Sequence, residues 1–259
     1  MSKVTDRLDN KQIVELAKKQ YEQQKRTNKF PANIVKFPSA GKVYSESSVL
    51  RSGELEMRHM TAYDEDILTN STYINSGVVF DKLLESLVIT PGFDVSELIY
   101  ADKESLIISA RILGYGNDYV VALNDSKDTP IKAIIDLSKL KYKDFLLKTD
   151  EHGFIEYVVE STKDTIKYKI LSETEITSID KDQLVSRYLE LSVQEINGSA
   201  DKNDITEFLQ YSLRAIEGRK LRNYITENMP GIETKTTAMG EDGSSHPAVF
   251  QFSGDIFRV

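Results

Sequence analysis

The stretch ADKESLIISARIL, residues 101–113, decides the fold that this sequence predicts. Its apolar residues recur at the spacing of one helix face, which should be the inner side of a helix: Leu106, Ile107, Ala110 and Leu113. Gly114-Tyr115-Gly116 follows directly and predicts the end of this helix, because glycine pairs of this kind interrupt helical structure.

Two short runs rich in apolar residues come next, at 119–123 and 131–137, and both are typical of strands. A cluster of turn-forming residues, 124–130, separates them. The pattern therefore predicts a helix that leads into a β-hairpin.

Further elements are predicted on both sides of this unit. Helices are expected at 9–27, 77–89, 173–196 (as a pair) and 203–227, and strands at 55–60, 154–159, 165–171, 232–239 and 248–257. Thr61 is a candidate helix N-cap, and Asp64, Glu65 and Asp66 follow it in the first turn, where acidic side chains suit the helix dipole.

Residues 54–137 and 165–257 share one plan. Each begins with a strand that ends at a hydroxyl residue, Thr61 or Ser172, continues through an acidic helix start and paired helices, and closes with a helix and a hairpin. The predicted class is α+β, mainly helical with small antiparallel hairpins. Two repeated helix-plus-hairpin halves are one hypothesis, and a single α+β domain with a chance pattern is the other. The expected divisions are an N-terminal helical arm (1–33), a first α+β half (34–150) and a second α+β half (151–259).

The composition excludes several classes of protein. The 259 residues contain 40% apolar and 29% charged residues, which is a globular rather than a disordered balance. Without cysteine there is no disulfide, thiolate zinc site, iron–sulfur cluster or cysteine nucleophile. The net charge of −8 argues against nucleic acid as a partner. No apolar run is long enough to span a membrane, and residues 1–19 lack the apolar region of a secretory signal.

Candidate chemical groups are few. His59, His152 and His246 lie far apart in the sequence and lack the spacing of a metal site. The acidic cluster 64–66 has the residue types for Mg²⁺ or acid–base chemistry, but helix capping explains the same residues and is the preferred interpretation. Residues 114–119 are glycine-rich, yet they follow a helix rather than a strand, which is the reverse of a phosphate-binding loop.

Asp102 and Arg111 stand out because they are charged residues within the apolar helix. We expect structural roles for both, through internal ion pairs. The sequence contains no recognisable catalytic constellation, so the prediction is a protein that is not an enzyme, with no catalytic, cofactor-binding or metal-binding residues and no cofactor. Once these functions are excluded, the residues alone predict an acidic α+β protein that binds other proteins.

Several short motifs, taken in order, resemble the T4-type bacteriophage baseplate hub and hub-assembly proteins. In the first half they are Phe37-Pro-Ser-Ala-Gly-Lys-Val-Tyr44, Leu55 to Thr61 with Asp64-Glu65, Asp102 with Arg111, Tyr115-Gly116 and Ile135-Asp136-Leu137-Ser138. In the second half they are Leu221-Arg222, Met229-Pro230-Gly231-Ile232 and Asp255-Ile256-Phe257-Arg258. The resemblance extends from about residue 34 to residue 259, and it rests on the order of motifs that are individually weak.

The resemblance implies a structural subunit of the baseplate hub of a contractile phage tail. The implied location is the virion tail baseplate, after synthesis in the bacterial host cytoplasm, and the implied partners are other hub and tail subunits. Some relatives carry cysteine pairs in their hairpin loops, like small zinc knuckles. Here the corresponding loops, 124–130 and 240–247, contain no cysteine, so metal is not carried over.

Two alternatives remain open. The first is a hub-assembly chaperone that is absent from the mature virion. The second is a hydrolase that degrades cell wall locally, which needs a pair of carboxylates in a cleft, and no such pair is marked in the sequence. The arm 1–33 and the C-terminal strand 248–259 are the expected docking segments, although the strand could equally pair within its own sheet.

Overall fold

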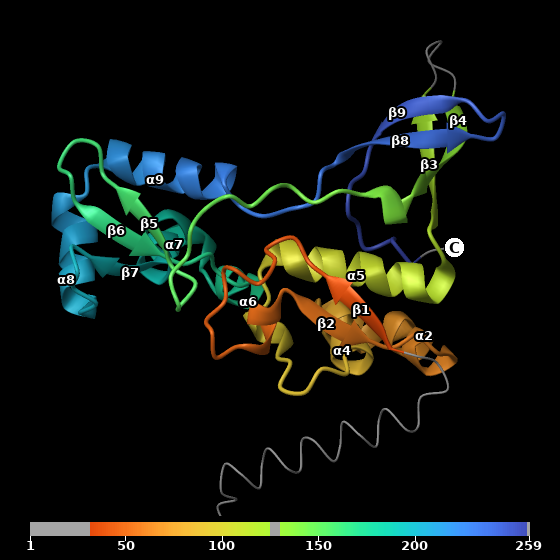
Figure 1. The fold of residues 1–259 in the computed structure, drawn as a ribbon, viewed down its shortest axis with the longest axis horizontal. Helices are drawn as coiled ribbons and strands as arrows, with labels where there is room; N and C mark the ends of the chain where they lie inside the picture. Colours follow the sequence, from red (N-terminus) through yellow and green to blue (C-terminus); the bar gives the residue numbers. More distant parts are fainter. Residues whose placement is uncertain (1–31, 125–129, 258–259) are drawn as a thin grey trace, which may run out of the picture.

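The computed structural model describes residues 32–124 and 130–257 of the chain. The predicted helix 9–27, and with it almost all of the arm 1–33, lies outside the described residues, as does most of the first hairpin loop. The described elements form three groups around one connected apolar core (Figure 1).

Helix α5 (Tyr100–Tyr115) lies between the other elements of the first group and the four-stranded sheet, and it confirms the helix predicted at 101–113 (Figure 1). It is buried on more than the predicted side, because Ala101, Asp102, Ile108 and Arg111 are buried in addition to three of its four predicted inner residues; the fourth, Leu113, is half-buried. Gly116 ends the helix as predicted. Its φ of 84° lies in the region that favours glycine, and its N–H donates to the Ile112 carbonyl oxygen at 2.9 Å.

The first group packs small helices against a two-stranded antiparallel sheet. The sheet pairs β1 (Asn33–Lys36) with β2 (Glu54–Met57), and β2 also forms an isolated bridge from Met57 to Val88. The remaining elements of this group are η1 (Val49–Ser52), α2 (Ala62–Thr69), α3 (Ser71–Ser76), α4 (Val79–Leu87) and η2 (Val95–Glu97).

The second group contains the sheet β5-β6-β7, formed by Ile155–Val158, Thr165–Tyr168 and Val193–Ile196. Its helical elements are α6 (Glu173–Thr177), η4 (Lys181–Gln183), α7 (Leu184–Ser192), α8 (Lys202–Glu207), the π-helical turn η5 (Phe208–Ser212) and α9 (Ala215–Glu227). The helix pair predicted through residue 196 is therefore wrong at its end, where β7 pairs with β6. The single helix predicted at 203–227 is also wrong, because Leu213 and Arg214 are extended and separate η5 from α9.

The third group is a four-stranded antiparallel sheet in the order β3-β4-β8-β9 (Figure 1). Its strands are β3 (Asp118–Asn124), β4 (Pro130–Asp136), β8 (Lys235–Gly240) and β9 (Ser245–Val249), and η3 (Leu137–Lys139) follows β4. The sheet contains one hairpin from 34–150 and one from 151–259. Two long connections lead back from it and pair with each other at Tyr142 and Ile232.

The C-terminal strand predicted at 248–257 is wrong beyond Val249, where β9 ends. The following residues leave the sheet and pack on the first group. Phe252 and Phe257 have their ring centroids 5.8 and 6.1 Å from that of Phe80, and Ile256 is buried. Packing of these partly buried aromatic rings against α4 and α5 replaces continued strand pairing.

The predicted α+β class is confirmed: helices combine with small antiparallel sheets. The narrower expectation of a mainly helical chain is not confirmed, because strands form three sheets among the described residues. In the same part of the chain, no helix is both long and apolar enough to cross a membrane.

Replacing Arg111 by Met should lower the free energy of unfolding by about 3 kcal/mol, because it removes a buried guanidinium and leaves three carbonyl oxygens, one of them buried, without this donor. The guanidinium donates to the carbonyl oxygens of Ile256 (3.0 Å), Gly116 (2.8 Å) and Asp118 (3.0 Å). Chemical denaturation measures the change. Lys139→Met at an exposed position is the control and should change stability by less than about 0.5 kcal/mol. Equal stability of the two variants would contradict this role for Arg111.

Candidate functional site

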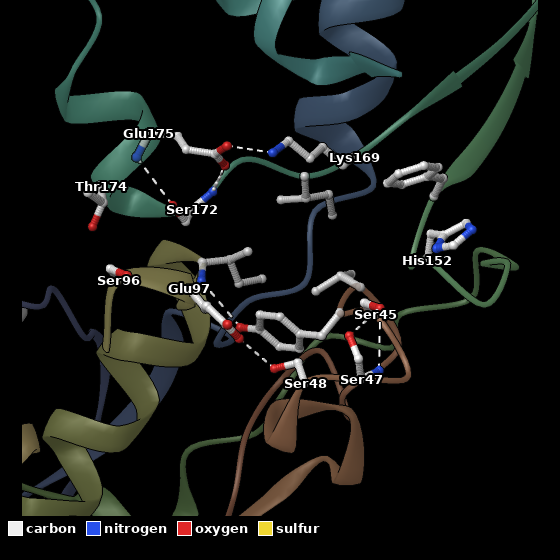
Figure 2. A pocket seen from close by; sticks show the side chains of 15 residues that line it. Ser45, Ser47, Ser48, Ser96, Glu97, His152, Lys169, Ser172, Thr174 and Glu175 are labelled. Carbon is white, nitrogen blue, oxygen red and sulfur yellow. Dashed lines mark hydrogen bonds and ion pairs between the residues drawn. The ribbon is translucent and has the colours of Figure 1, made fainter. Parts of the chain in front are cut away.

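A cleft with a volume of about 450 Å³ lies where the first and second groups meet (Figure 2). One side comes from the turns around residues 43–48 and 96–99, and the other from residues 152–154 and 169–175. Hydroxyl groups dominate its polar lining, and a few charged or aromatic side chains accompany them: Ser45, Ser47, Ser48, Ser96, Ser172, Thr174, Glu97, Lys169, Glu175, His152 and Phe154.

The wall of the cleft on the first-group side rests on the buried carboxylate of Asp102. The Tyr44 hydroxyl donates to Asp102 Oδ2 at 2.6 Å, and the Ile99 N–H donates to that hydroxyl at 3.2 Å. Ser39 donates twice, from its hydroxyl to Oδ2 at 2.6 Å and from its backbone N–H to Oδ1 at 2.9 Å. One carboxylate thus joins the Phe37–Tyr44 motif to the start of α5.

Burial governs the protonation of this cluster. It raises the pKa of Asp102 to about 6, although the hydrogen bonds from Ser39 and Tyr44 act in the opposite direction. Burial, together with the nearby Asp102 carboxylate, also raises the pKa of Tyr44 well above its ordinary value. At neutral pH the Asp102 carboxylate is therefore ionised and the Tyr44 phenol remains a donor.

The opposite wall contains a capping box at the start of α6. The Ser172 hydroxyl accepts from the Glu175 N–H, and the Glu175 carboxylate accepts from the Ser172 N–H, so both groups are satisfied (Figure 2). Lys169 pairs with the same carboxylate. Most charged groups on this side of the cleft are thus engaged with one another.

The first group contains the same arrangement at the start of α2. Thr61 caps the helix as predicted, and its N–H donates to Asp64 Oδ2 at 2.8 Å. Arg58 binds the Asp64 carboxylate through both terminal nitrogens, at 2.7 and 2.8 Å. Burial alone would raise the pKa of Asp64, but hydrogen bonds from Arg58, Thr61 and Ser86 lower it to about 2. The acidic cluster 64–66 therefore begins with a structural carboxylate.

The expected ion pairs of Asp102 and Arg111 are wrong, although their roles are structural. Asp102 binds hydroxyl and amide donors, and Arg111 binds three backbone carbonyl oxygens. Ser39 and Tyr44, which bind Asp102, do not stand out in the sequence as a cluster. They lie 63 and 58 residues from it, and only their place in the Phe37–Tyr44 motif marked them.

The three histidines have separate surroundings. His59 Nδ1 lies 2.9 Å from the Leu113 carbonyl oxygen, and His246 Nε2 lies 2.6 Å from the Ser244 hydroxyl. His152 borders the cleft, where its ring lies 5.4 Å from the Phe154 ring between centroids. Across residues 32–124 and 130–257, no group of three or more histidine and acidic side chains could hold a metal ion.

The groups that line the cleft can form hydrogen bonds, but they are not arranged as a nucleophile beside a base. The Ser48 hydroxyl donates to Glu97 Oε2 at 2.5 Å, and this pair is exposed. Among the described residues, no hydrogen bond joins His152 to a cleft hydroxyl. A nucleophilic serine needs an adjacent base that is itself oriented by a third group, and the cleft does not present this arrangement.

A second candidate surface is the outer face of the four-stranded sheet. Val120, Ile134 and Met239 lie opposite one another on adjacent strands and point to the same side, and all three are exposed. We call these three residues the outer apolar row. An apolar row on an exposed sheet face is typical of a surface that contacts another protein.

No protein-family model, curated protein or solved structure significantly matches this chain.

Replacing Asp102 by Ala should lower the free energy of unfolding by about 3 kcal/mol at neutral pH, because Ser39 and Tyr44 lose a charged acceptor. Asp102→Asn keeps one acceptor oxygen and should cost less. Thermal and chemical unfolding of both variants measure this difference, and equal stabilities of Asp102→Ala and the original chain would refute the role of the carboxylate.

The pH dependence of stability gives a separate check. The folded pKa of about 6 lies above the ordinary value of 3.8, so the folded state retains a proton that the unfolded state has released. The contribution of Asp102 to stability is greatest below pH 4, falls by about 3 kcal/mol as the pH rises to 6, and is constant above it. The difference in stability between the original chain and Asp102→Asn should therefore change between pH 4 and pH 6. A difference independent of pH would contradict the raised pKa.

Proposed function

We propose that this chain is a structural subunit of the baseplate hub of a contractile phage tail, acting through protein–protein contacts rather than catalysis. The observation that carries the proposal is the outer apolar row on a sheet to which both halves contribute. The partners are other hub and tail subunits, and the location is the virion tail baseplate after synthesis in the bacterial host cytoplasm.

The resemblance to hub proteins supports this proposal, and the positions of its motifs add to that support. Residues of the Phe37–Tyr44 motif contact Asp102 at one end of α5. At the other end, Arg111 contacts Gly116 and Ile256, which belong to two more of the motifs. The motifs are thus explained as parts of a shared scaffold, without a catalytic role.

We also propose that residues 54–137 and 165–257 derive from one duplicated unit. The cation, hydroxyl and carboxylate of Arg58, Thr61 and Asp64 recur with the same spacing in Lys169, Ser172 and Glu175. The N–H groups of Arg58 and Lys169 each donate to a residue at the end of a later helix, Leu87 and Ser192. Helices α5 and α9 then each precede a hairpin of the shared sheet.

Quantitative mass spectrometry of purified phage particles tests the hub function. The chain is counted against a tail subunit of known copy number. A small whole-number ratio is expected for a built-in subunit. Presence in hub precursors but absence from finished particles would identify the assembly chaperone instead, and absence from both would overturn the phage proposal.

Replacing Ile134 by Lys should abolish or strongly reduce incorporation into hubs, because it places a charge in the middle of the outer apolar row. Ile216→Lys, on the exposed part of α9, is the control and should be incorporated normally. Circular dichroism and thermal unfolding establish that both variants fold. Normal incorporation of a folded Ile134→Lys variant would exclude this face as the contact surface.

A further inference from the structure

The four-stranded sheet has two edges, and they differ in the groups that they present. On β9, the bond from the Phe250 N–H to the Thr234 carbonyl oxygen (2.7 Å) sets the alternation of the ladder. It follows that Pro247 is among the residues whose backbone faces away from β8. Proline has no N–H, so this edge lacks a donor at its centre and is protected against strand addition.

The edge formed by β3 has no such protection. The Leu137 N–H donates to the Asn117 carbonyl oxygen at 2.9 Å, which continues the β3–β4 register by one pair. The alternation of the ladder then directs the backbone N–H and C=O groups of Val120 and Ala122 away from β4. Within the described residues these outward groups of Val120 and Ala122 make no hydrogen bond, whereas the neighbouring Asp118 carbonyl oxygen accepts from Arg111.

The central part of the β3 edge is also uncharged, so two copies of this acidic protein can approach each other there without charge repulsion. Residues 119–123, YVVAL, carry no charge, although the chain has a net charge of −8. Charged residues and proline, which natural edges use to prevent pairing, are absent from this stretch. The side chain of Val120 is 61% exposed and extends the outer apolar row to the edge itself.

We infer that β3 is a self-association edge, at which a second copy of this chain adds its own β3 in antiparallel orientation. A two-fold axis at Val121 places Val120 opposite Ala122 of the second copy, so that their outward N–H and C=O groups bond to each other. Asp118 then lies opposite Asn124, and the two Asp118 carboxylates are separated by roughly 20 Å of strand. The result is one eight-stranded sheet with a continuous outer face.

This register favours β3 of a second copy over a strand from an unrelated protein. The outward groups at positions 120 and 122 are self-complementary about residue 121, and within residues 118–124 the register places no two like charges opposite each other. A segment rich in lysine, such as residues 1–31, gains no charge complementarity from an uncharged edge. The inference concerns the isolated chain and does not depend on the proposed hub function.

Sedimentation velocity of the full chain over a wide concentration range tests the self-association. The original chain should show a reversible monomer–dimer equilibrium. Val120→Lys should shift it to monomer, since lysine on an edge strand opposes pairing. Val249→Lys is a closely matched control, because Val249 is 59% exposed on the opposite edge strand, and this variant should dimerise like the original chain. A chain that is monomeric throughout, or equal loss in both variants, would overturn the inference.

Cysteine cross-linking tests the register. Because the chain contains no cysteine, any disulfide must form through the introduced residue. Val121→Cys places two thiols opposite each other in a non-hydrogen-bonded pair, where the Cα separation of about 4.5 Å permits a disulfide. This variant should form a covalent dimer under mild oxidation. Leu123→Cys is the control, since its opposite residue is Tyr119 of the second copy. Cross-linking of both variants to the same extent, or of neither, would refute the two-fold pairing at Val121.

Discussion

Helix α5 requires polar groups to be buried at both of its ends, and the rest of the structure depends on how these groups are satisfied. Asp102 needs donors, and it obtains them from Ser39, Tyr44 and their motif. Arg111 needs acceptors, and it obtains them from the backbone after α5 and from Ile256 near the C-terminus. Because a buried charge without partners is strongly destabilising, these contacts fix segments from both ends of the described chain to a single helix.

Local patterns were sufficient to predict the elements around α5 but not the contacts between them. The helix predicted at 101–113, its end at Gly116 and the following hairpin are all present, because each depends on neighbouring residues. The combination of two hairpins into one sheet depends on the pairing of β4 with β8, more than 100 residues later. The partners of Asp102 are similarly distant, so the sequence marked the charged residues without indicating what they bind.

The wrong predictions share a physical cause. The sequence 203–227 has an apolar period of 3.6 residues throughout, but the chain is extended at Leu213 and Arg214. A single apolar helix face therefore does not extend over the whole segment. The run 248–257 has the pattern of a strand, but Phe252 and Phe257 leave the sheet and pack on Phe80. In both cases tertiary packing overrides a local preference, which is the usual weakness of reasoning from periodicity.

The same constraint explains why the cleft is a weaker functional candidate than the sheet. Around the cleft, most polar groups already have partners within the chain, as in the capping box at Ser172 and the pairing of Lys169 with Glu175. A ligand there would have to replace bonds that stabilise the fold. On the sheet, the side chains of the outer apolar row are exposed, and the outward backbone groups of Val120 and Ala122 have no such partners among the described residues. Binding at the sheet therefore adds interactions without breaking any, which favours contact with another protein chain over chemistry in the cleft.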